Sequence, residues 1–377
     1  MKFIIAIDSF KGSLTSIQAC GAAKQAILSV FRDAEIITVP IADGGEGTAT
    51  AFYHAFGGRM EKVTVTSPDF TNISASYAIL PDNTAVIEMA EASGLTLVRG
   101  EKNAGEATSL GTGELIRDAL GKGCRSFIIG LGGSATNDGG AGALAALGVK
   151  FLDKQGNPIK PNGNGLCKLY TIDTDGLVPE LAESVFTIAC DVENTLCGEN
   201  GASHIYGEQK GASGNDIIRL DDNLYHYAKS VEKTTGRDIL GIKGGGAAGG
   251  MCAGLMGFLN AETQSGIKLL LERIKFKELI TDADYIFSGE GKADAQTANG
   301  KVIIGIADYT KQAGKPLIVV AGQLADGYEC IFEKGVTAAF STTHYAEPFE
   351  QIKHRAEKDL SDTVKNICRI IRAVGKI

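Results

Sequence analysis

The sequence predicts an α/β protein made of two α/β domains. Short runs of apolar and β-branched residues alternate with segments of helical periodicity, which is the pattern of a parallel sheet built from βαβ units. Glycine is abundant, with 49 residues in 377, whereas prolines number only 8, so a low-complexity or collagen-like chain is excluded. The glycines gather where predicted strands end, which indicates loops whose backbone approaches a ligand.

The overall composition excludes several classes of protein. Hydrophobic residues make up 44% of the chain and charged residues 22%, which is ordinary for a globular protein and argues against disorder. The formal net charge of -8 offers no basic face for nucleic acid, and no apolar run reaches the roughly 18 residues of a membrane span. Eight cysteines without a C-x-x-C pair and five histidines without zinc-like spacing favour a reducing, cytoplasmic location and no structural metal.

The N-terminal segment predicts a strand followed by a helix. Residues 3–7 (FIIAI) are apolar and end at Asp8, too early for the apolar core of a leader peptide. Thr15 or Ser16 is expected to cap a helix that runs to about Phe31.

The middle of the chain has a different pattern. Three strand-like pieces separated by turn signals, 61–66, 73–80 and 84–89, predict an antiparallel meander. The other expected strands are 36–39, 126–130, 149–152, 185–190, 284–288, 317–321 and 336–340. A second helix is expected after the loop that ends at Thr48, and the other expected helices are 109–120, 138–147, 221–236, 301–313 and 355–374.

Both ends of the chain read as regular βαβ, whereas the middle is more irregular. We therefore predict a discontinuous Rossmann-like domain of residues 1–62 plus 278–377 and an inserted α/β domain of residues 63–277 that carries the meander. The active site is expected in the cleft between the two domains.

Six predicted loops share one composition: a strand, then Asp or Glu beside glycine and Ser or Thr. Ligands of open α/β sheets bind at the carboxyl ends of strands, where backbone N–H groups hold phosphate without side chains. Carboxylates suit Mg²⁺, and lysines offset the charge of a transferring phosphoryl group. A single such Asp is as often a helix cap, but six loops together indicate an enzyme for an anionic small molecule. The loops are residues 8–13, 43–48, 130–142, 191–194, 244–250 and 289–294.

Nucleotide fingerprints give one alternative. No G-x-x-x-x-G-K-[ST] occurs, so a P-loop is not expected. Gly130-x-Gly132-x-x-Ala135 follows a predicted strand, and Asp153 stands where an acid would bind ribose, so a dinucleotide-dependent oxidoreductase stays open. The loop continues through residues 136–140, longer and more polar than a tight pyrophosphate turn. A non-catalytic, effector-binding protein is the third interpretation.

Taken together, the loops resemble the bacterial type I glycerate kinase family along nearly the whole chain. The resemblance implies a cytoplasmic enzyme that transfers the γ-phosphoryl group of ATP to D-glycerate, with Mg²⁺ and 2-phosphoglycerate as product, and it leaves room for a homo-oligomer. Lys292 departs from the family's usual Arg and lacks its bidentate fork. The matching stretches are IDSFKGSLTS (7–16), IADGGEGT (41–48), AVIEMAEASGL (85–95), SLGTGELI (109–116), GLGGSATNDGGAGALAALG (130–148), ACDVENTLCGENGASHIYGEQKGA (189–212), GGGAAGGM (244–251) and SGEGKADAQTANGK (288–301).

The predicted site residues come from these loops. Asp191 ends a buried strand and is the expected base for the attacking hydroxyl, with Lys292 and Asp294 as further catalytic residues. The tentative Mg²⁺ ligands are Glu193 and Asp294. The expected substrate-binding residues are Asp8, Ser9, Lys11, Asp43, Glu46, Ser134, Asn137 and Asp138. The expected phosphate- or nucleotide-binding residues are Gly132, Gly133, Gly245, Gly246, Gly289 and Gly291.

Overall fold

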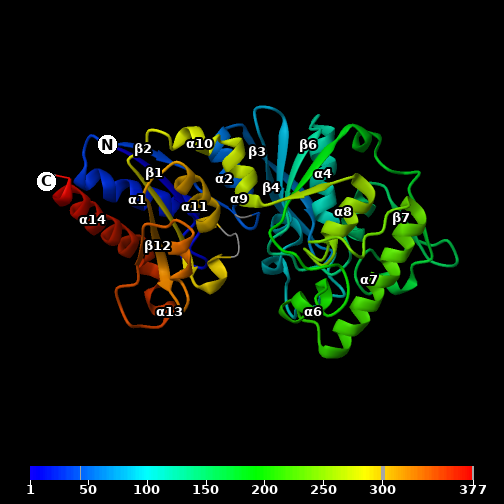
Figure 1. Ribbon diagram of the computed structural model, residues 1–377. Helices are drawn as coiled ribbons and strands as arrows, with labels where there is room; N and C mark the ends of the chain where they lie inside the picture. The colour runs from blue at the N-terminus through cyan, green and yellow to red at the C-terminus, as the bar shows by residue number, and fades with distance from the viewer. Residues whose placement is uncertain (43, 299–301, 376–377) are drawn as a thin grey trace. The chain divides into compact units, whose positions relative to one another are not determined.

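The predicted alternation of strands and helices is present in the computed structural model, which describes residues 1–42, 44–298 and 302–375 and confirms the α/β class (Figure 1). The chain forms two compact units, which we call unit 1 (Met1–Asp43 with Ile267–Ile377) and unit 2 (Gly44–Gly266). The domain boundaries expected from the sequence, at 62/63 and 277/278, and the cleft between the domains stay predictions.

Unit 1 is built on a five-stranded sheet in which all strands are parallel, in the order β13-β12-β11-β1-β2. Five of the six residues of β1 are buried, as expected for a strand covered on both faces. The strands are β1 (Lys2–Ile7), β2 (Glu35–Thr38), β11 (Tyr285–Ala293), β12 (Leu317–Leu324) and β13 (Ala338–Ser341).

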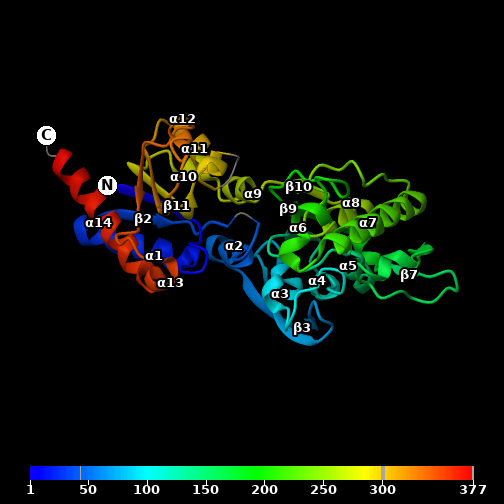
Figure 2. The same cartoon turned by 90° about the horizontal axis from the view of Figure 1, so that it is seen from below.

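The helices α1 and α14 lie side by side against this sheet (Figures 1 and 2). Thr15 caps α1 as predicted: Gln18 N donates to Thr15 Oγ1 (3.2 Å) and Thr15 N donates to Gln18 Oε1 (2.9 Å). The helices are α1 (Ser16–Val30), α9 (Gly266–Arg273), α10 (Phe276–Leu279), α11 (Val302–Gln312), α12 (Cys330–Glu333), α13 (Phe349–Ile352) and α14 (Ala356–Val374).

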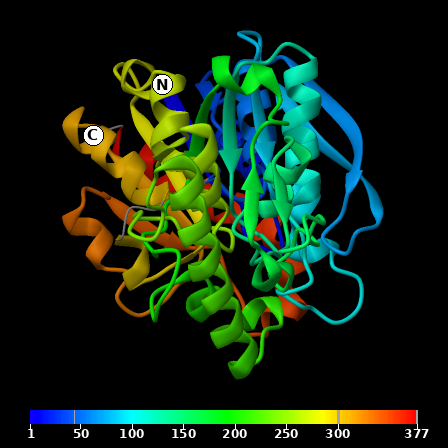
Figure 3. The ribbon, with the colours of Figure 1, turned by 90° about the vertical axis from the view of Figure 1, so that its right-hand side faces the viewer.

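Unit 2 contains a six-stranded sheet in the order β10-β9-β6-β5-β4-β3 (Figure 3). The strands β3, β4 and β5 pair antiparallel, which confirms the predicted meander, while β5, β6, β9 and β10 are parallel. The strands are β3 (Arg59–Thr66), β4 (Asn72–Ile79), β5 (Thr84–Glu88), β6 (Ser126–Gly130), β9 (Val185–Ala189) and β10 (Glu262–Gln264).

One helix of unit 2 starts earlier in the chain than the sequence predicts. α7 begins at Gly214 rather than near residue 221, because Ser213 and Asp216 form a capping box at its start. Within the described ranges no helix is both long and apolar enough to cross a membrane. The helices are α2 (Thr48–Phe56), α3 (Ala90–Ser93), α4 (Leu110–Gly121), α5 (Ala141–Ala146), α6 (Ala202–Tyr206), α7 (Gly214–Thr235) and α8 (Met251–Leu259).

The strand expected at residues 149–152 does not join the main sheet. β7 (Lys150–Leu152) pairs antiparallel with β8 (Thr171–Asp173) in a separate two-stranded sheet. A dinucleotide fold needs this strand in parallel with β6, so the oxidoreductase alternative lacks its βαβ unit. Asp153 instead closes its own turn, where its Oδ1 accepts from the backbone N–H groups of Gln155 and Asn157, both at 2.9 Å.

Candidate functional site

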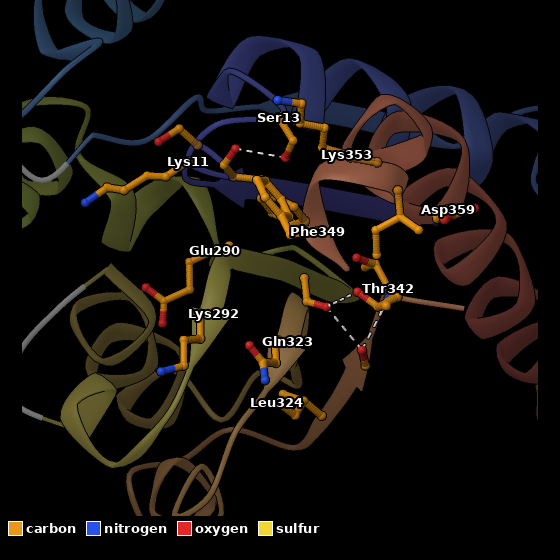
Figure 4. Close-up of a pocket in the computed structure, with 18 of the residues that line it drawn as sticks. Lys11, Ser13, Glu290, Lys292, Gln323, Leu324, Thr342, Phe349, Lys353 and Asp359 are labelled. Carbon is orange, nitrogen blue, oxygen red and sulfur yellow. Dashed lines mark hydrogen bonds between the residues drawn. The ribbon is translucent and has the colours of Figure 1, made fainter. Parts of the chain in front are cut away.

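The carboxyl ends of four parallel strands in unit 1 surround a pocket with a volume of about 840 Å³ (Figure 4). Parallel strands end at one edge of the sheet, so residues distant in sequence meet there. We call this the unit 1 pocket, and its size suits a small-molecule ligand. It is lined by Asp8, Ser9, Phe10, Lys11 and Ser13 after β1, by Glu290, Gly291, Lys292 and Asp294 of β11 and its end, by Gly322, Gln323 and Leu324 of β12, by Ser341, Thr342 and Thr343 at β13, and by Glu347, Phe349, Ile352, Lys353, Ala356 and Asp359.

Several predicted site residues meet in this pocket, from the loops at residues 8–13 and 289–294. Lys292 Nζ lies 3.0 Å from Asp294 Oδ2, and Asp294 Oδ1 accepts from the backbone N–H of Gln296 at 2.9 Å. Asp294 therefore orients the Lys292 amine and also holds the turn that follows β11. Gly289, by contrast, packs against the Val320 carbonyl of β12, where a Cβ has no room.

Glu290 lines the pocket, although it is not among the predicted site residues. Its side chain is buried, and its Oε1 accepts from Thr297 Oγ1 at 2.9 Å. The available signal was an acidic residue between two glycines at the end of an apolar run, where a buried charge is kept only with partners. Asp8 is also buried, and its Oδ1 accepts from Ser9 N at 2.6 Å.

The carboxylates of this pocket suit the Mg²⁺ that the resemblance implies. In the described part of the chain, no three His, Cys, Asp or Glu side chains form a metal centre by themselves. Mg²⁺ needs fewer than three protein ligands, because it keeps several waters and combines one or two carboxylates with substrate phosphates. Asp8, Glu290 and Asp294 supply oxygen ligands of this kind.

In unit 2 the glycine-rich loops pack on one another through their backbones. A Cβ on Gly132 would lie 2.5 Å from Gly45 Cα, and one on Gly246 would meet the Thr195 carbonyl. Gly245 is buried, and its Cβ position lies 2.9 Å from the Ile242 carbonyl. These glycines are therefore required for close packing, whatever they bind. Gly133 differs, because it is exposed and has φ +74°.

We expect Gly132→Ala to lower the free energy of unfolding by about 1–3 kcal/mol, because the added methyl overpacks a backbone contact. Gly121→Ala is the matched control, since its Cβ position is open and the substitution should be neutral or slightly stabilising. Urea unfolding of both variants checks the difference. Equal stabilities would contradict the packing role.

Asp138 is fully buried at the centre of the loop 130–142. Its Oδ2 accepts from Ser109 N (2.8 Å), Ser109 Oγ (2.7 Å) and Gly142 N (3.3 Å), and its Oδ1 accepts from Gly140 N (3.1 Å). Burial raises the pKa of Asp138, while these four donors favour the carboxylate. The side chain thus ties together the starts of α4 and α5. Asn137, also buried, donates from Nδ2 to Ser203 Oγ at 2.9 Å.

Lys210 is also not among the predicted site residues, although it lies in one of the stretches that match the family. Its side chain is 3% exposed, and Nζ donates to Ser134 Oγ and to the Thr136 carbonyl, both at 2.8 Å. Burial lowers the pKa of Lys210 to about 7, against an attraction by Asp138 that raises it. Lys210 therefore holds the predicted substrate-binding residue Ser134 in place.

The depressed pKa of Lys210 predicts a pH dependence of stability. The unfolded chain holds this proton up to about pH 10.5, whereas the folded protein releases it near pH 7, so the unfolded state binds more protons between these values. The free energy of unfolding should therefore rise with pH across this window in the wild type and rise less in Lys210→Met. Urea unfolding at several pH values between about 7 and 10.5 compares the wild type with Lys210→Met. If the free energies of unfolding of both proteins changed equally with pH, the lowered pKa of Lys210 would be refuted.

Glu88 anchors the loop that carries Glu46. The Glu88 carboxylate is buried and accepts from the N–H groups of Gly47 (2.9 Å) and Ala49 (2.6 Å) at the start of α2. Burial raises the pKa of Glu88 to about 7. Glu46 itself is exposed, and the predicted residue Asp43 lies outside the described residues.

Asp191, the expected base, is exposed just after β9. Its Oδ2 accepts from the backbone N–H of Gly266 at 3.3 Å. Glu193 is also on the surface, with a 76% exposed side chain paired with Lys243 at 2.7 Å. Glu193 and Asp294, the two predicted Mg²⁺ ligands, belong to different units.

A parallel sheet that ends in a pocket of lysines, carboxylates and glycines defines an α/β protein of the small-molecule-binding class. The comparisons with known proteins make this specific. The chain belongs to the glycerate kinase family, whose model matches residues 3–372. The resemblance found in the sequence is thereby confirmed.

Individual relatives match along almost their whole length. The glycerate kinase of Haemophilus influenzae is 43% identical over 98% of this chain and 99% of its own, and the glycerate 2-kinase of Escherichia coli K12 is 44% identical over 100% and 99%. A crystal structure assigned as glycerate kinase 2 from Salmonella typhimurium LT2 superposes with a TM-score of 0.88, at 40% identity and full coverage of both chains. These matches also leave the oxidoreductase alternative without support.

Proposed function

We propose that this protein transfers the γ-phosphoryl group of ATP to D-glycerate, with Mg²⁺, and releases 2-phosphoglycerate. Its full-length similarity to proteins named glycerate kinase and glycerate 2-kinase carries the proposal. Both substrates are small and anionic, in keeping with the residues that the strand-end loops present.

The unit 1 pocket supports this chemistry. Phosphoryl transfer depends mainly on positioning and on neutralising the charge of the phosphates. Lys11 and Lys292 supply cations, and Asp8, Glu290 and Asp294 supply oxygen ligands for a metal–nucleotide complex. Mg²⁺ held by these carboxylates would offset the negative charge of the nucleotide phosphates.

Roles for the other loops complete the proposal. Asp191 takes the proton of the attacking hydroxyl, and Ser134, held by Lys210, contacts glycerate. Glu193, which pairs with Lys243 at the surface, would be a further oxygen ligand for the metal. The backbone N–H groups of the glycine loops bind the anionic ends of the substrates.

The proposal is tested by coupled ADP release with each enantiomer of glycerate, in the presence of Mg²⁺ and after its removal with EDTA. We expect turnover with D-glycerate and Mg²⁺ only, and a phosphorus NMR spectrum of the 2-phospho product. ADP release with neither enantiomer would overturn the proposal. A 3-phospho product would correct the position of transfer alone.

A further inference from the structure

We propose that the unit 1 pocket is the nucleotide site of this enzyme, with the purine ring against Phe349 and the phosphate chain beside Lys11 and Lys292. This inference rests on the proposed function and deepens it, because it names which unit holds ATP. It follows from the size, the apolar wall and the charges of the pocket.

Glycerate would make few favourable contacts with the apolar wall of the pocket. Phe10, Leu324, Phe349 and Ile352 all line the pocket. Glycerate is a three-carbon acid with hydroxyl or carboxylate groups on every carbon, so it has almost no apolar surface to bury against them. A purine ring has two apolar faces, and the pocket volume of about 840 Å³ suits a nucleotide better than a seven-heavy-atom acid.

Phe349 is placed to stack on such a ring. It lies in α13, and its ring atoms Cε1 and Cζ lie 3.4 Å from the position that a Cβ on Gly12 would take. Gly12 has φ +80°, a conformation that favours glycine, so the ring packs on bare backbone. The side chain is nevertheless 49% exposed, which leaves apolar surface open to a ligand.

The charges fit a metal-bound phosphate chain rather than a free acid. In Figure 4, Lys11, Glu290 and Lys292 lie to one side of Phe349, and Thr342 and Asp359 lie to the other. Lys11 is exposed at the pocket and has no salt bridge to another described residue, so its charge is available to phosphate.

The carboxylates of the pocket also favour a metal-bound nucleotide over free glycerate. Asp8, Glu290 and Asp294 would repel the carboxylate of an unmetallated acid such as glycerate. The same groups attract Mg²⁺ that travels with nucleotide phosphates. The pocket thus favours the complex of metal and nucleotide over the acceptor substrate.

Tryptophan reporters test the location directly, because the natural chain contains no tryptophan. Phe349→Trp places a single fluorophore at the proposed stacking position. Phe332→Trp is the matched control, since Phe332 lies in α12 of the same unit, is 40% exposed and is outside the pocket lining. We expect ADP with Mg²⁺ to change the emission of the first variant saturably and not that of the second, and glycerate alone to change neither.

Binding measurements on the full chain separate the two ends of the nucleotide. Phe349→Ala should raise the Kd of both ADP and adenosine by about tenfold, because aromatic–base stacking is lost. Lys292→Met should raise the Kd of ADP by about tenfold and leave that of adenosine unchanged. Phe332→Ala should alter neither. Calorimetry with ADP and ligand-observed NMR with adenosine give these values.

The outcomes distinguish the inference from the proposed function. Unchanged ADP binding in Phe349→Ala and no emission change in Phe349→Trp, in an enzyme that still phosphorylates glycerate, would overturn the nucleotide assignment alone. A raised KM for glycerate with unchanged ADP binding would reassign the pocket to the acceptor. Nucleotide binding at Phe349 without any glycerate phosphorylation would overturn the proposed function and leave the assignment standing.

Discussion

Asp191→Asn is expected to reduce kcat for glycerate phosphorylation by about 100-fold or more, since an amide cannot take the proton of the attacking hydroxyl. The substitution keeps the shape of the side chain, and the exposed position after β9 predicts little change in stability. The KM values for ATP and glycerate should change much less than kcat. Steady-state kinetics with both substrates varied measures this separation.

The matched control is Asp175→Asn, another exposed carboxylate of unit 2, in a turn after β8 and remote from the predicted loops. It should leave turnover unchanged. If Asp191→Asn also kept full turnover, Asp191 would lose the role of base, and a carboxylate of the unit 1 pocket would become the next candidate.

Asp138→Ala is expected to destabilise the protein by several kcal/mol. The substitution leaves Ser109 N, Ser109 Oγ, Gly140 N and Gly142 N buried without their acceptor, and each such donor costs about 1–3 kcal/mol. Urea unfolding measures the loss. Asp138→Asn should cost less, because an amide oxygen at the Oδ2 position still accepts from three of the four donors.

This comparison also tests the substrate-binding role predicted for Asp138. A structural role predicts that Asp138→Asn lowers stability and leaves the KM for glycerate close to that of the wild type. A large rise in that KM at unchanged stability would favour direct contact with substrate instead.

The local signals in the sequence were sufficient for most of the fold. The meander at residues 61–89 and the capped helix after Thr15 follow from alternation and capping, which act over a few residues. The strand expected at residues 149–152 is present, but its pairing with β8 could not be predicted, because pairing partners depend on long-range packing that periodicity does not encode. The start of α7 differs from the prediction, because the first residue after the capping Ser213 is Gly214, and glycine is a poor helix former.

The loops that form the candidate site could be predicted from the sequence, but several of its individual residues could not. Strand-end loops at residues 8–13 and 289–294 do meet at one pocket, as a parallel sheet requires. Phe349 lies far along the chain in a single helical turn and carried no local signal. Lys210 was equally hidden, because burial of a lysine depends on what the rest of the unit packs around it.

The backbone packing of the glycine loops in unit 2 has a consequence for laboratory evolution. Gly132 and Gly246 have no room for a side chain, so libraries that randomise them would lose most members to misfolding. Under the proposed function, in which these loops contact glycerate, diversity is better placed at the exposed residues Glu46 in the loop 43–48 and Gly133 in the loop 130–142. At Gly133, with φ +74°, asparagine or aspartate is the change most compatible with the backbone. Such a library would vary the surface of the loops while their shared backbone scaffold stayed intact.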